Sequence, residues 1–521
     1  MPQIQSVVYR GICMKIKIKN WGPVKEFEYD FSKSVIVTYG DNNIGKSYAM
    51  QVVYLSLKHL VAYAKKTVRF PSSSYYLFKD VENGQAPEIQ AVVDFAVNKE
   101  VQIEDISKKL EEICAGKLAQ RLFPAIIDSF NNTFGTFETM LEENPTIEIR
   151  TDDKFKCILL FREEKIELQL NRKPTRLRKS LSEFHKSRNG KEQLDIYVYQ
   201  NHVNMPVELV TQEVANMQKE FCIEILRRIK NVYFLPASRS GIYAGMSSFG
   251  PILAQLSQNR AYIKGTIQIP SISEPISDYY MMLSEIRGDM LGHFSECAEE
   301  IEKSVLKGDV LYDKKSKAIV YKPFGSQLQL EMRDTSSMVS EISPITAFLK
   351  YVVEKGIDVR VRRAIGSEDK PQSVIFIEEP EAHLHPSNQV SLIKAFVKLA
   401  EQDVTLVMAS HSNYIFNQLN NLVLGKALKS EDYSPILLRK KGTRSYSSYM
   451  NIDELGADDE NFADISEQLM EEREELLDIL MQEEFGGIFL NDSFKYKEVF
   501  LYLVTTSYQG EVLLYPKRSA A

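Results

Sequence analysis

The chain has 521 residues, a length typical of roughly two to four domains. Its formal net charge is −7, which excludes a polycation, so any contact with nucleic acid must come from a local basic patch. The five cysteines form no C-x-x-C pair, which excludes a disulfide framework or a cysteine zinc site and favours a reducing, cytoplasmic location. No apolar run reaches the ~20 residues of a membrane span, so we expect no membrane contact.

Two strands are expected at the beginning of the patterned sequence, which starts at Met14, a candidate natural start. Residues 14–18 alternate apolar and basic side chains, as an edge strand would. Phe27, Tyr29 and Phe31 continue with a period of two. A third, wholly apolar strand is expected at residues 35–37. This order predicts a β-rich entry to a nucleotide-binding fold.

Residues 40–47 read GDNNIGKS, a complete G-x-x-x-x-G-K-[ST] phosphate-binding loop. The glycines let backbone N–H groups close around the β-phosphate of ATP or GTP, and the helix expected from Lys46 directs its positive dipole end at the same anion. Lys46 adds a charge for the β- and γ-phosphates, and the Ser47 hydroxyl suits Mg²⁺. The predicted nucleotide-binding residues of the loop are Gly40, Asp41, Asn42, Asn43, Ile44, Gly45, Lys46 and Ser47.

The region from 67 to 230 contains no pattern that resembles a known catalytic site. Strands are expected at 89–97, 157–161 and 166–170, and helices at 106–122 and 207–229. Its most basic segment could meet phosphate backbones or an acidic partner, but a solvated loop explains it equally well, because Pro174 and Gly190 punctuate it and no aromatic residue is interleaved. The basic residues are Arg172, Lys173, Arg176, Arg178, Lys179, Lys186, Arg188 and Lys191.

The next expected strand, residues 232–235, ends in Pro-Ala-Ser-Arg at 236–239. One long helix is expected over 276–306. Because one face of it is apolar and the other charged, it should pack on one side only, like an arm or a lid. β-prone sequence up to Leu330 then returns the chain to the core.

The second half of a nucleotide site is expected where residues 373–379, SVIFIEE, end a buried strand in two carboxylates. One acid would lie beside Mg²⁺ and the other would deprotonate the attacking water, so Glu378 is the metal-side acid and Glu379 the catalytic base. A further strand, 404–408, ends near His411, which is placed to contact the γ-phosphate. His383 and His385 lie two apart, but further ligands with zinc spacing are lacking, so we expect no metal there.

These motifs, in this order, resemble the ABC-type ATPases with a large insertion, the SMC, Rad50 and RecF group, and most closely the OLD family. The resemblance is carried by GDNNIGKS, by FLPASR at 234–239, by FIEEPEAHLHP at 376–386 and by ASHSNYI at 409–415. It covers the two ends of the chain. It implies an α/β fold, with an ABC-type P-loop NTPase head interrupted by a large inserted α+β or helical arm region.

The resemblance also implies that two heads stack head to tail, and that a signature serine from one subunit completes the ATP site of the other. The counterparts here are Ser336 and Ser337, ahead of an apolar helix at 345–353. Relatives have glycine where this chain has Met338, and a side chain there should crowd the γ-phosphate, so we expect slow hydrolysis.

Other family roles transfer position by position. Glu378 takes the Walker B position, Glu379 that of the catalytic glutamate, residues 380–386 the D-loop, and His411 that of the switch histidine. With Lys46, Glu379 and His411 are the expected catalytic residues, and Ser47 and Glu378 the expected Mg²⁺ ligands. Arg239 matches the family's arginine after Pro-Ala, without an assigned role.

The C-terminal part differs from full-length OLD nucleases, because it lacks their Toprim motifs. A strand pair is expected at 435–439 and 446–450, followed by an acidic segment at 453–484 in which Ile465, Leu469, Leu476 and Leu480 would share one helix face. The expected divisions are a P-loop lobe at 14–66, the inserted region at 67–230, a strand, helical arm and return at 231–330, the C-terminal lobe of the head at 331–450 and an acidic extension at 451–521.

Stand-alone ATPases of this kind resemble the sensor subunits of two-component bacterial antiphage systems, such as PtuA of Septu and AriA of PARIS. The leading hypothesis is an ATPase that forms at least a homodimer and serves as sensor or scaffold for a separate nuclease or toxin. The alternative is a DNA-repair ATPase of the RecF or Rad50 type that clamps DNA. A nuclease in its own right has the least support, since no additional acidic cluster is visible.

Overall fold

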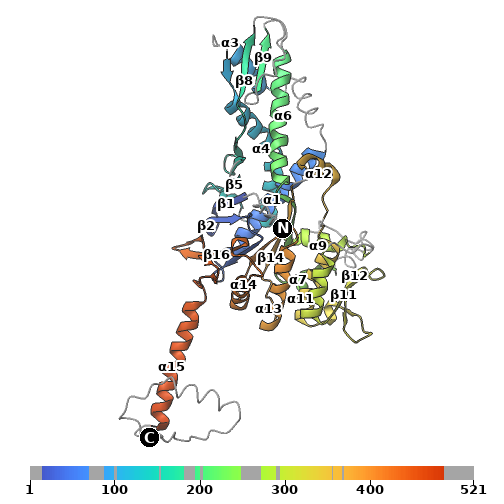
Figure 1. Ribbon diagram of the computed structural model, residues 1–521, viewed down its shortest axis with the longest axis vertical. Coiled ribbons are helices and arrows are strands. Elements are labelled where there is room, and N and C mark those ends of the chain that lie inside the picture. The colour runs from blue at the N-terminus through green and yellow to red at the C-terminus, as the bar shows by residue number, and fades with distance from the viewer. Residues whose placement is uncertain are drawn as a thin grey trace, which may run out of the picture. The chain divides into compact units, whose positions relative to one another are not determined.

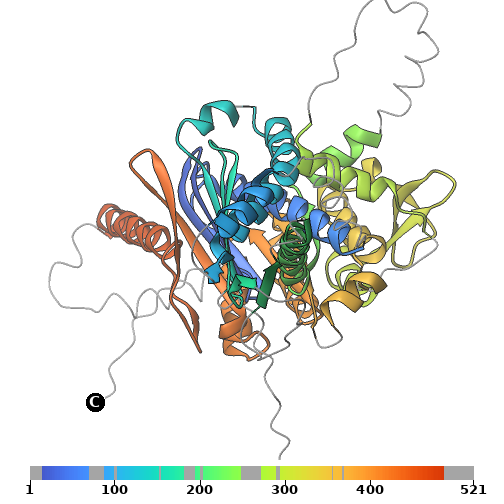
Figure 2. The ribbon, with the colours of Figure 1, turned by 90° about the horizontal axis from the view of Figure 1, so that it is seen from above.

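The computed structural model describes residues 14–69, 87–98, 103–135, 137–151, 154–180, 194–199, 204–247, 272–288, 294–354, 356–366 and 369–485. The chain forms two compact units, residues 1–461 and residues 462–521. The first unit is built on one large mixed sheet with helices on both of its faces (Figures 1 and 2). The predicted α/β fold class is therefore confirmed.

An 11-stranded sheet forms the centre of the first unit. The P-loop strand β3 pairs in parallel with β15 on one side and β16 on the other, and β15, β14 and β10 continue the parallel part. Segments from the second half of the chain thus enclose the P-loop strand. The order is β10 (Ile229–Leu235), β14 (Gln372–Glu378), β15 (Val404–Ala409), β3 (Val35–Tyr39), β16 (Tyr433–Lys441), β17 (Arg444–Tyr449), β2 (Val24–Asp30), β1 (Met14–Trp21), β5 (Thr146–Thr151), β6 (Phe155–Leu160) and β7 (Lys165–Leu170).

The main hydrophobic core lies between one face of this sheet and three long helices, α1 (Lys46–Arg69), α4 (Ser107–Thr133) and α6 (Asn204–Leu226). Because successive residues of a strand point to opposite faces, Ile36 joins that core, whereas Tyr39 contacts Phe416 of α14 (Asn413–Leu424) on the other side. Helix α13 (Pro386–Ala400) packs beside α14 (Figure 1). This layering places the carboxyl ends of β3, β14 and β15 at one edge, where doubly wound sheets bind ligands.

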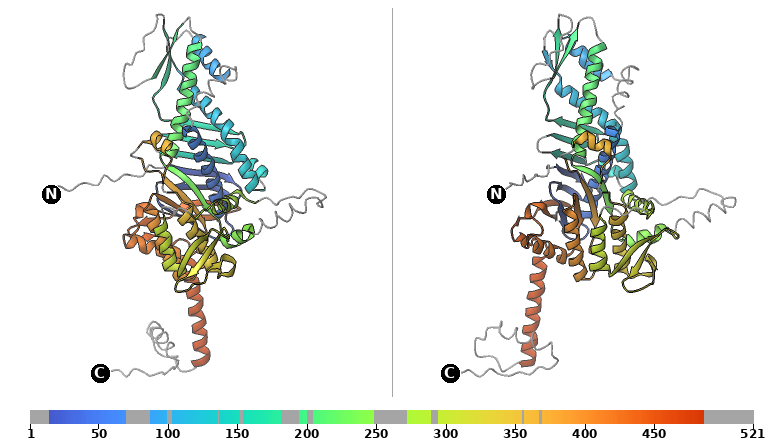
Figure 3. Two further views of the ribbon diagram at one scale, coloured as in Figure 1. Left: turned by 90° about the vertical axis from the view of Figure 1, so that its right-hand side faces the viewer. Right: turned by 45° about the vertical axis from the view of Figure 1, so that its right-hand side comes forward.

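The inserted region is continuous with the head. Strands β5, β6 and β7 extend the large sheet from β1, and the single tryptophan, Trp21, is fully buried against Phe130, Phe137 and Phe161 of the insertion. Helices α4 and α6 continue toward a small sheet of β4 (Ile103–Asp105), β8 (Thr175–Ser180) and β9 (Leu194–Tyr199) (Figure 3). The predicted strands at 157–161 and 166–170 and the helix at 106–122 are confirmed. The helix predicted at 207–229 is also present as α6, but it ends at Leu226, and Ile229 begins β10. Burial of these aromatic rings makes the insertion an integral part of the head.

The edge-strand prediction for residues 14–18 is wrong, because β1 lies between β2 and β5. Its apolar side chains are fully buried, and its lysines are neutralised by a neighbouring strand. Lys15 Nζ lies 3.3 Å from Asp30 Oδ2, and Lys17 Nζ lies 2.5 Å from Glu26 Oε1. A basic face therefore fits inside a sheet when acidic residues are opposite it.

The strand predicted at 89–97 is a helix, α3 (Pro87–Asn98). Its buried positions are Ile89, Val92 and Val93, which follow the helical spacing of three and four rather than a period of two. A short apolar run of this composition suits either structure, and packing against α4 and α6 decides for the helix.

The single helix predicted over 276–306 is also wrong. The described residues between 274 and 306 form α9 (Glu274–Ser284), α10 (Ser295–Ile301) and a π-helical turn, η2 (Glu302–Leu306). Gly288 follows α9 with a φ of +67°, a left-handed conformation that favours glycine, and a Cβ there would lie 2.8 Å from the ring of Tyr312. The β-prone sequence that follows forms a separate three-stranded sheet, β11 (Gly308–Asp313), β12 (Ala318–Pro323) and β13 (Leu330–Glu331), and does not join the large sheet.

The remaining elements of the first unit are short or peripheral. The predicted strand pair at 435–439 and 446–450 is confirmed as β16 and β17. The helix predicted at 345–353 is the second half of α11, which begins eight residues earlier and ends at Tyr351. The remaining elements of the first unit are α5 (Phe137–Leu141), α7 (Arg239–Ser247), η3 (Met332–Asp334), α11 (Ser337–Tyr351), α12 (Val359–Ile365), η4 (Ser430–Asp432), β18 (Ile452–Asp453) and β19 (Gly456–Ala457).

The predicted basic segment is described only in part. Arg172 forms an ion pair with Glu213 of α6, so one of its charges is neutralised within the fold. Lys186, Arg188 and Lys191 lie outside the described residues. The side chains of Arg178 and Lys179 are also outside the described part, so the basic segment stays a prediction.

The second unit contributes one described helix, α15 (Ala463–Phe485). It is rich in Glu and Asp, with Arg473 as its single basic residue. Five of its large apolar side chains are more than half exposed, namely Leu469, Met470, Leu476, Ile479 and Leu480, whereas Leu477 is half-buried. The predicted helix is thus confirmed, and the Ile465 side chain lies outside the described residues. Among all described helices, none is both long and apolar enough to cross a membrane.

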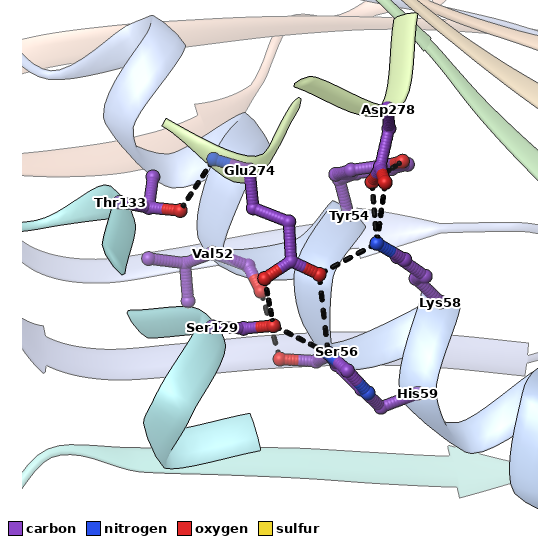
Figure 4. A network of polar contacts seen from close by, with 9 residues as sticks. All are labelled: Val52, Tyr54, Ser56, Lys58, His59, Ser129, Thr133, Glu274 and Asp278. Carbon is purple, nitrogen blue, oxygen red and sulfur yellow. Dashed lines mark hydrogen bonds and ion pairs between the residues drawn. The ribbon is translucent and has the colours of Figure 1, made fainter. Parts of the chain in front are cut away.

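Helix α9 is anchored to α1 by a polar network (Figure 4). Lys58 Nζ lies 2.5 Å from Glu274 Oε1 and 2.7 Å from Asp278 Oδ1, and the Tyr54 hydroxyl donates to Asp278 Oδ2 at 2.7 Å. Burial would raise the pKa of Glu274, but its bonds with His59, Lys58 and Ser129 outweigh burial and lower that pKa to about 2. The ionised carboxylate therefore stabilises the fold.

We expect Glu274→Gln to lower the free energy of unfolding at neutral pH by about 2 kcal/mol, the usual size for hydrogen bonds to a charged group. A depressed pKa contributes stability above the ordinary value of 4.5, and this stability is lost as pH falls toward 2. The difference between wild type and variant should therefore shrink over that window in urea unfolding curves. Glu299→Gln, which removes an exposed pair with Lys303, is the control. A difference that does not change with pH would contradict the role of the charge.

Candidate functional site

The loop at residues 40–47 connects β3 to α1 and needs glycine at two positions. Gly40 has a φ of +135°, and a Cβ there would lie 2.4 Å from the carbonyl oxygen of Leu438. Gly45 has a φ of +98°, and its Cβ would lie 2.8 Å from Val24 Cγ2. Any residue other than glycine at Gly40 or Gly45 would therefore distort the loop. Its backbone is shaped as a cradle at the positive end of a 24-residue helix.

Lys46 begins α1 and turns back over the loop. Its Nζ donates to the carbonyl oxygens of Gly40 at 2.8 Å and Asp41 at 2.6 Å, and lies 3.3 Å from His411 Nδ1. Burial lowers the pKa of Lys46 to about 8, and burial together with the Lys46 charge lowers the pKa of His411. The structure thus brings together two predicted residues from opposite ends of the chain.

Glu378 is the last residue of β14 and is 5% exposed. Its Oε1 accepts from Gln51 Nε2 at 3.1 Å, and its Oε2 accepts from the Ala237 backbone N–H at 3.2 Å. Ser47, one turn before Gln51 on α1, also hydrogen-bonds to it. Burial raises the pKa of Glu378. A buried carboxylate beside a serine hydroxyl is a fitting donor set for a hard divalent cation.

Glu379 follows directly and has a φ of +42°, in the left-handed region that a residue with a side chain rarely adopts. Its N–H donates to the carbonyl of Ala409 at 3.0 Å, which ties it to the end of β15. The Glu379 charge opposes the effect of burial on the pKa of both Lys46 and His411. The Glu379 charge therefore acts on both side chains.

Glu381 is a residue whose role the sequence did not indicate. Its Oε1 accepts from the His411 backbone N–H at 2.5 Å and from Ser410 Oγ at 3.0 Å, so it holds the loop that carries His411. Its Oε2 is buried and has no hydrogen-bond partner among the described residues. Burial raises the pKa of this carboxyl. The only signal in the sequence is a third acid two residues after Glu379.

Ser336 and Ser337 are placed at the N-terminus of α11, and both are exposed. Ser336 is the N-cap and accepts a bond from the Val339 N–H at 3.4 Å. Within the described part of the chain, no hydrogen bond links either serine to residues 40–47 or to the two strand-end carboxylates. Met338 is half-buried.

His383 and His385, which follow the two strand-end carboxylates in the sequence, make no hydrogen bond to the phosphate loop within the described residues. His385 caps α13, since its Nδ1 accepts from the Ser387 N–H at 3.3 Å, and His383 is exposed. Over the described ranges, no group of three or more His, Cys, Asp or Glu side chains could hold a metal ion.

Comparison with known proteins identifies the family. The family model of the AAA ATPase domain, AAA_15, matches residues 14–416. No curated protein matches the chain.

Solved SMC head domains align over most of the chain with low similarity. An SmcHead bound to the C-winged helix domain of ScpA is 9% identical, covers 85% of this chain and 98% of its own, and has a TM-score of 0.34. The SMC head domain from Thermotoga maritima is 8% identical, with 85% and 100% covered and a TM-score of 0.32. An Smc head domain with an extended coiled coil, bound to the C-terminal domain of ScpA derived from Pyrococcus furiosus, is 10% identical, with 89% and 99% covered and a TM-score of 0.33. TM-scores this low support no statement about activity or partners.

The family model spans the P-loop, both strand-end carboxylates and His411. The chain therefore belongs to the AAA ATPase domain family, AAA_15, and is an ATPase of that type.

Proposed function

We propose that the chain is a slow, ABC-type ATPase of the cytoplasm that dimerises head to tail and acts as sensor or scaffold for a separate nuclease or toxin in bacterial antiphage defence. The observation that carries the ATPase part is the contact of Lys46 Nζ with His411 Nδ1 at 3.3 Å, beside the carboxylates that end β14. Groups for the phosphates, the cation and the attacking water thus share one edge of the sheet.

The residues present fit ATP with Mg²⁺. The loop offers a glycine cradle for phosphates, and Ser47 and Glu378 would hold the cation, whose charge would offset the cost of burying that carboxylate. When bound, Mg²⁺ neutralises phosphate charge. Lys46 would exchange its bonds to the loop carbonyls for the β- and γ-phosphates. Glu379 would accept a proton from the attacking water, and His411 would contact the γ-phosphate.

Head-to-tail dimerisation is supported by the position of the signature-like serines. Ser336 and Ser337 are exposed at the N-terminus of a 15-residue helix, where backbone N–H groups and the helix dipole attract an anion. They make no hydrogen bond to the phosphate loop of the same chain within the described residues. A γ-phosphate bound to a second subunit would satisfy this end of α11. The Met338 side chain beside it would crowd that approach, so we propose turnover below about one per second, at the bottom of the usual range.

The effector would bind α15. Exposed leucines on an acidic helix suit a partner groove that is apolar in the middle and basic at its rim. Because the helix belongs to a compact unit of its own, its loss should leave the nucleotide site intact.

We expect a chain ended after residue 461 to bind ATP with a dissociation constant within about threefold of the full chain, but no longer to co-purify with the nuclease or toxin that the full chain binds. The double variant Leu476→Glu, Leu480→Glu should weaken that complex by roughly 100-fold, as loss of two buried leucines implies. Leu455→Glu, at a 71% exposed leucine of the first unit, is the matched control. Retention of the effector by the shortened chain would contradict docking on α15.

A further inference from the structure

Arg239 is the first residue of α7 and is completely buried. Its Nη1 donates to the carbonyl oxygens of Pro236 at 2.9 Å and Glu378 at 2.8 Å, and its Nη2 donates to the carbonyl of Glu379 at 3.1 Å. A buried guanidinium is costly unless its donors are satisfied. Here two of these donors bind the main-chain carbonyls of Glu378 and Glu379.

Glu341 of α11 lies on the other side of Arg239 and is 1% exposed. Its Oε2 accepts from the Arg239 N–H at 3.0 Å and lies 3.4 Å from Arg239 Nε, while its main-chain carbonyl accepts from that Nε at 3.3 Å. Its Oε1 accepts from the Ser240 N–H at 3.2 Å and from Ser240 Oγ at 2.5 Å. One carboxylate therefore pairs with the arginine and caps the N-terminus of α7.

The two sets of contacts join three segments that are distant in the sequence. Glu341 is about one helical turn beyond Ser336 and Ser337 on α11, and Arg239 spans from Glu341 to the end of β14. At that end, Glu379 has its strained φ of +42°. Such a backbone persists only when the surrounding structure holds it in place, and the hydrogen bond from Arg239 Nη2 to its carbonyl does so.

We propose that Arg239 is a positioning residue for Glu379, and that the Arg239–Glu341 pair makes the N-terminus of α11 and the end of β14 move as one body. The inference rests on the proposed roles of Glu379 as base and of α11 as the helix that meets the partner's ATP. The inference goes beyond these roles. When α11 of one subunit contacts the ATP of its partner, the Arg239–Glu341 pair would set the position of Glu379 at the first subunit's own ATP site.

Two conservative variants separate positioning from general stability. Arg239→Lys keeps the charge but loses the planar fork that reaches several carbonyls, and Glu341→Gln keeps the shape but loses the charge. For each variant the kcat of ATP hydrolysis, the dissociation constant of ATP and the thermal unfolding midpoint are measured on the full chain. We expect kcat to fall by about 100-fold, as a misplaced reacting group implies, with the ATP dissociation constant within about threefold of wild type.

The double variant Arg239→Lys, Glu341→Gln should hydrolyse ATP no more slowly than the poorer single variant, because the two residues act as a unit. Arg228→Lys is the matched control. Its arginine is 4% exposed and paired with Glu224 at 3.5 Å, in the segment between α6 and β10. It should lower the unfolding midpoint and leave kcat unchanged.

Several other outcomes would contradict the inference. Wild-type kcat in both folded single variants would overturn the inference and leave the proposed function standing. An equal loss of kcat in Arg228→Lys would show that lost stability alone lowers kcat, and additive losses in the double variant would show that Arg239 and Glu341 act independently. Either result would also overturn the inference. If Arg239→Lys does not fold, Glu341→Gln decides by the same measurements. Absence of ATP hydrolysis by the wild-type chain would overturn the proposed function together with the inference.

Discussion

Lys46→Ala is expected to weaken ATP binding by on the order of 100-fold, because charge-assisted contacts to the β- and γ-phosphates are worth about 1.5–3 kcal/mol. In the wild-type chain Lys46 Nζ is already held at the site by the carbonyls of Gly40 and Asp41. Its ammonium is therefore poised at the loop before ATP arrives. Alanine removes this charge and leaves the backbone N–H groups of the loop in place. Isothermal titration or a fluorescent ATP analogue measures the change directly.

The control for Lys46→Ala is Lys66→Ala, at an exposed lysine in the last turn of the same helix. It removes the same charge without touching the loop, and ATP affinity should not change. Thermal unfolding of Lys46→Ala shows whether the loop is still folded. Equal ATP affinity in Lys46→Ala and wild type would remove the basis for assigning this loop to phosphate binding.

Glu379→Gln is expected to separate binding from hydrolysis. The variant should bind ATP and Mg²⁺ like the wild type, since Ser47 and Glu378 are unchanged, while the hydrolysis rate falls by about 10²–10⁴-fold with the loss of a general base. ATP should then remain bound, and a stable dimer should accumulate with ATP but not with ADP. Hydrolysis in single-turnover experiments and molar mass by light scattering report the two effects separately.

Glu378→Gln is the comparison variant, and it should instead weaken the dependence of ATP binding on Mg²⁺. Hydrolysis by Glu379→Gln at the wild-type rate would mean that another residue is the base. Glu381 would be the first to examine, because its Oε2 is buried without a hydrogen-bond partner in the described structure and its Oε1 holds the His411 loop.

Lys46, His411 and Glu381 are linked by hydrogen bonds across the candidate site. Glu381 binds the backbone of His411, and the His411 ring reaches Lys46. Binding of a phosphate by Lys46 would therefore act on the loops after β14 and β15 together. Loops at the carboxyl ends of parallel strands are well placed for such coupling, because neighbouring strands hold them close together.

Several parts of the fold could be predicted because their signals are local. The P-loop motif with a buried strand before it, and the apolar strand that ends in two acids, are confined to short stretches whose residues interact with near neighbours. Strands β6, β7, β14, β15, β16 and β17 were predictable for the same reason. The run at 89–97 was not, because a short apolar segment fits both a period of 2 and a period of 3.6, and only its packing against α4 and α6 selects the helix.

The sequence by itself predicted the residues of the candidate site: a glycine-rich loop, a lysine, a serine, two strand-end carboxylates and a histidine, each recognisable from its neighbours in the chain. Only the tertiary structure decided which of these groups meet. Sheet pairing places Ala409 beside Glu378 and Thr38, and so carries His411 to Lys46. Buried contacts likewise gave Arg239 its partners and Glu381 its place, because long-range pairing depends on how strands and helices pack, which no local pattern records.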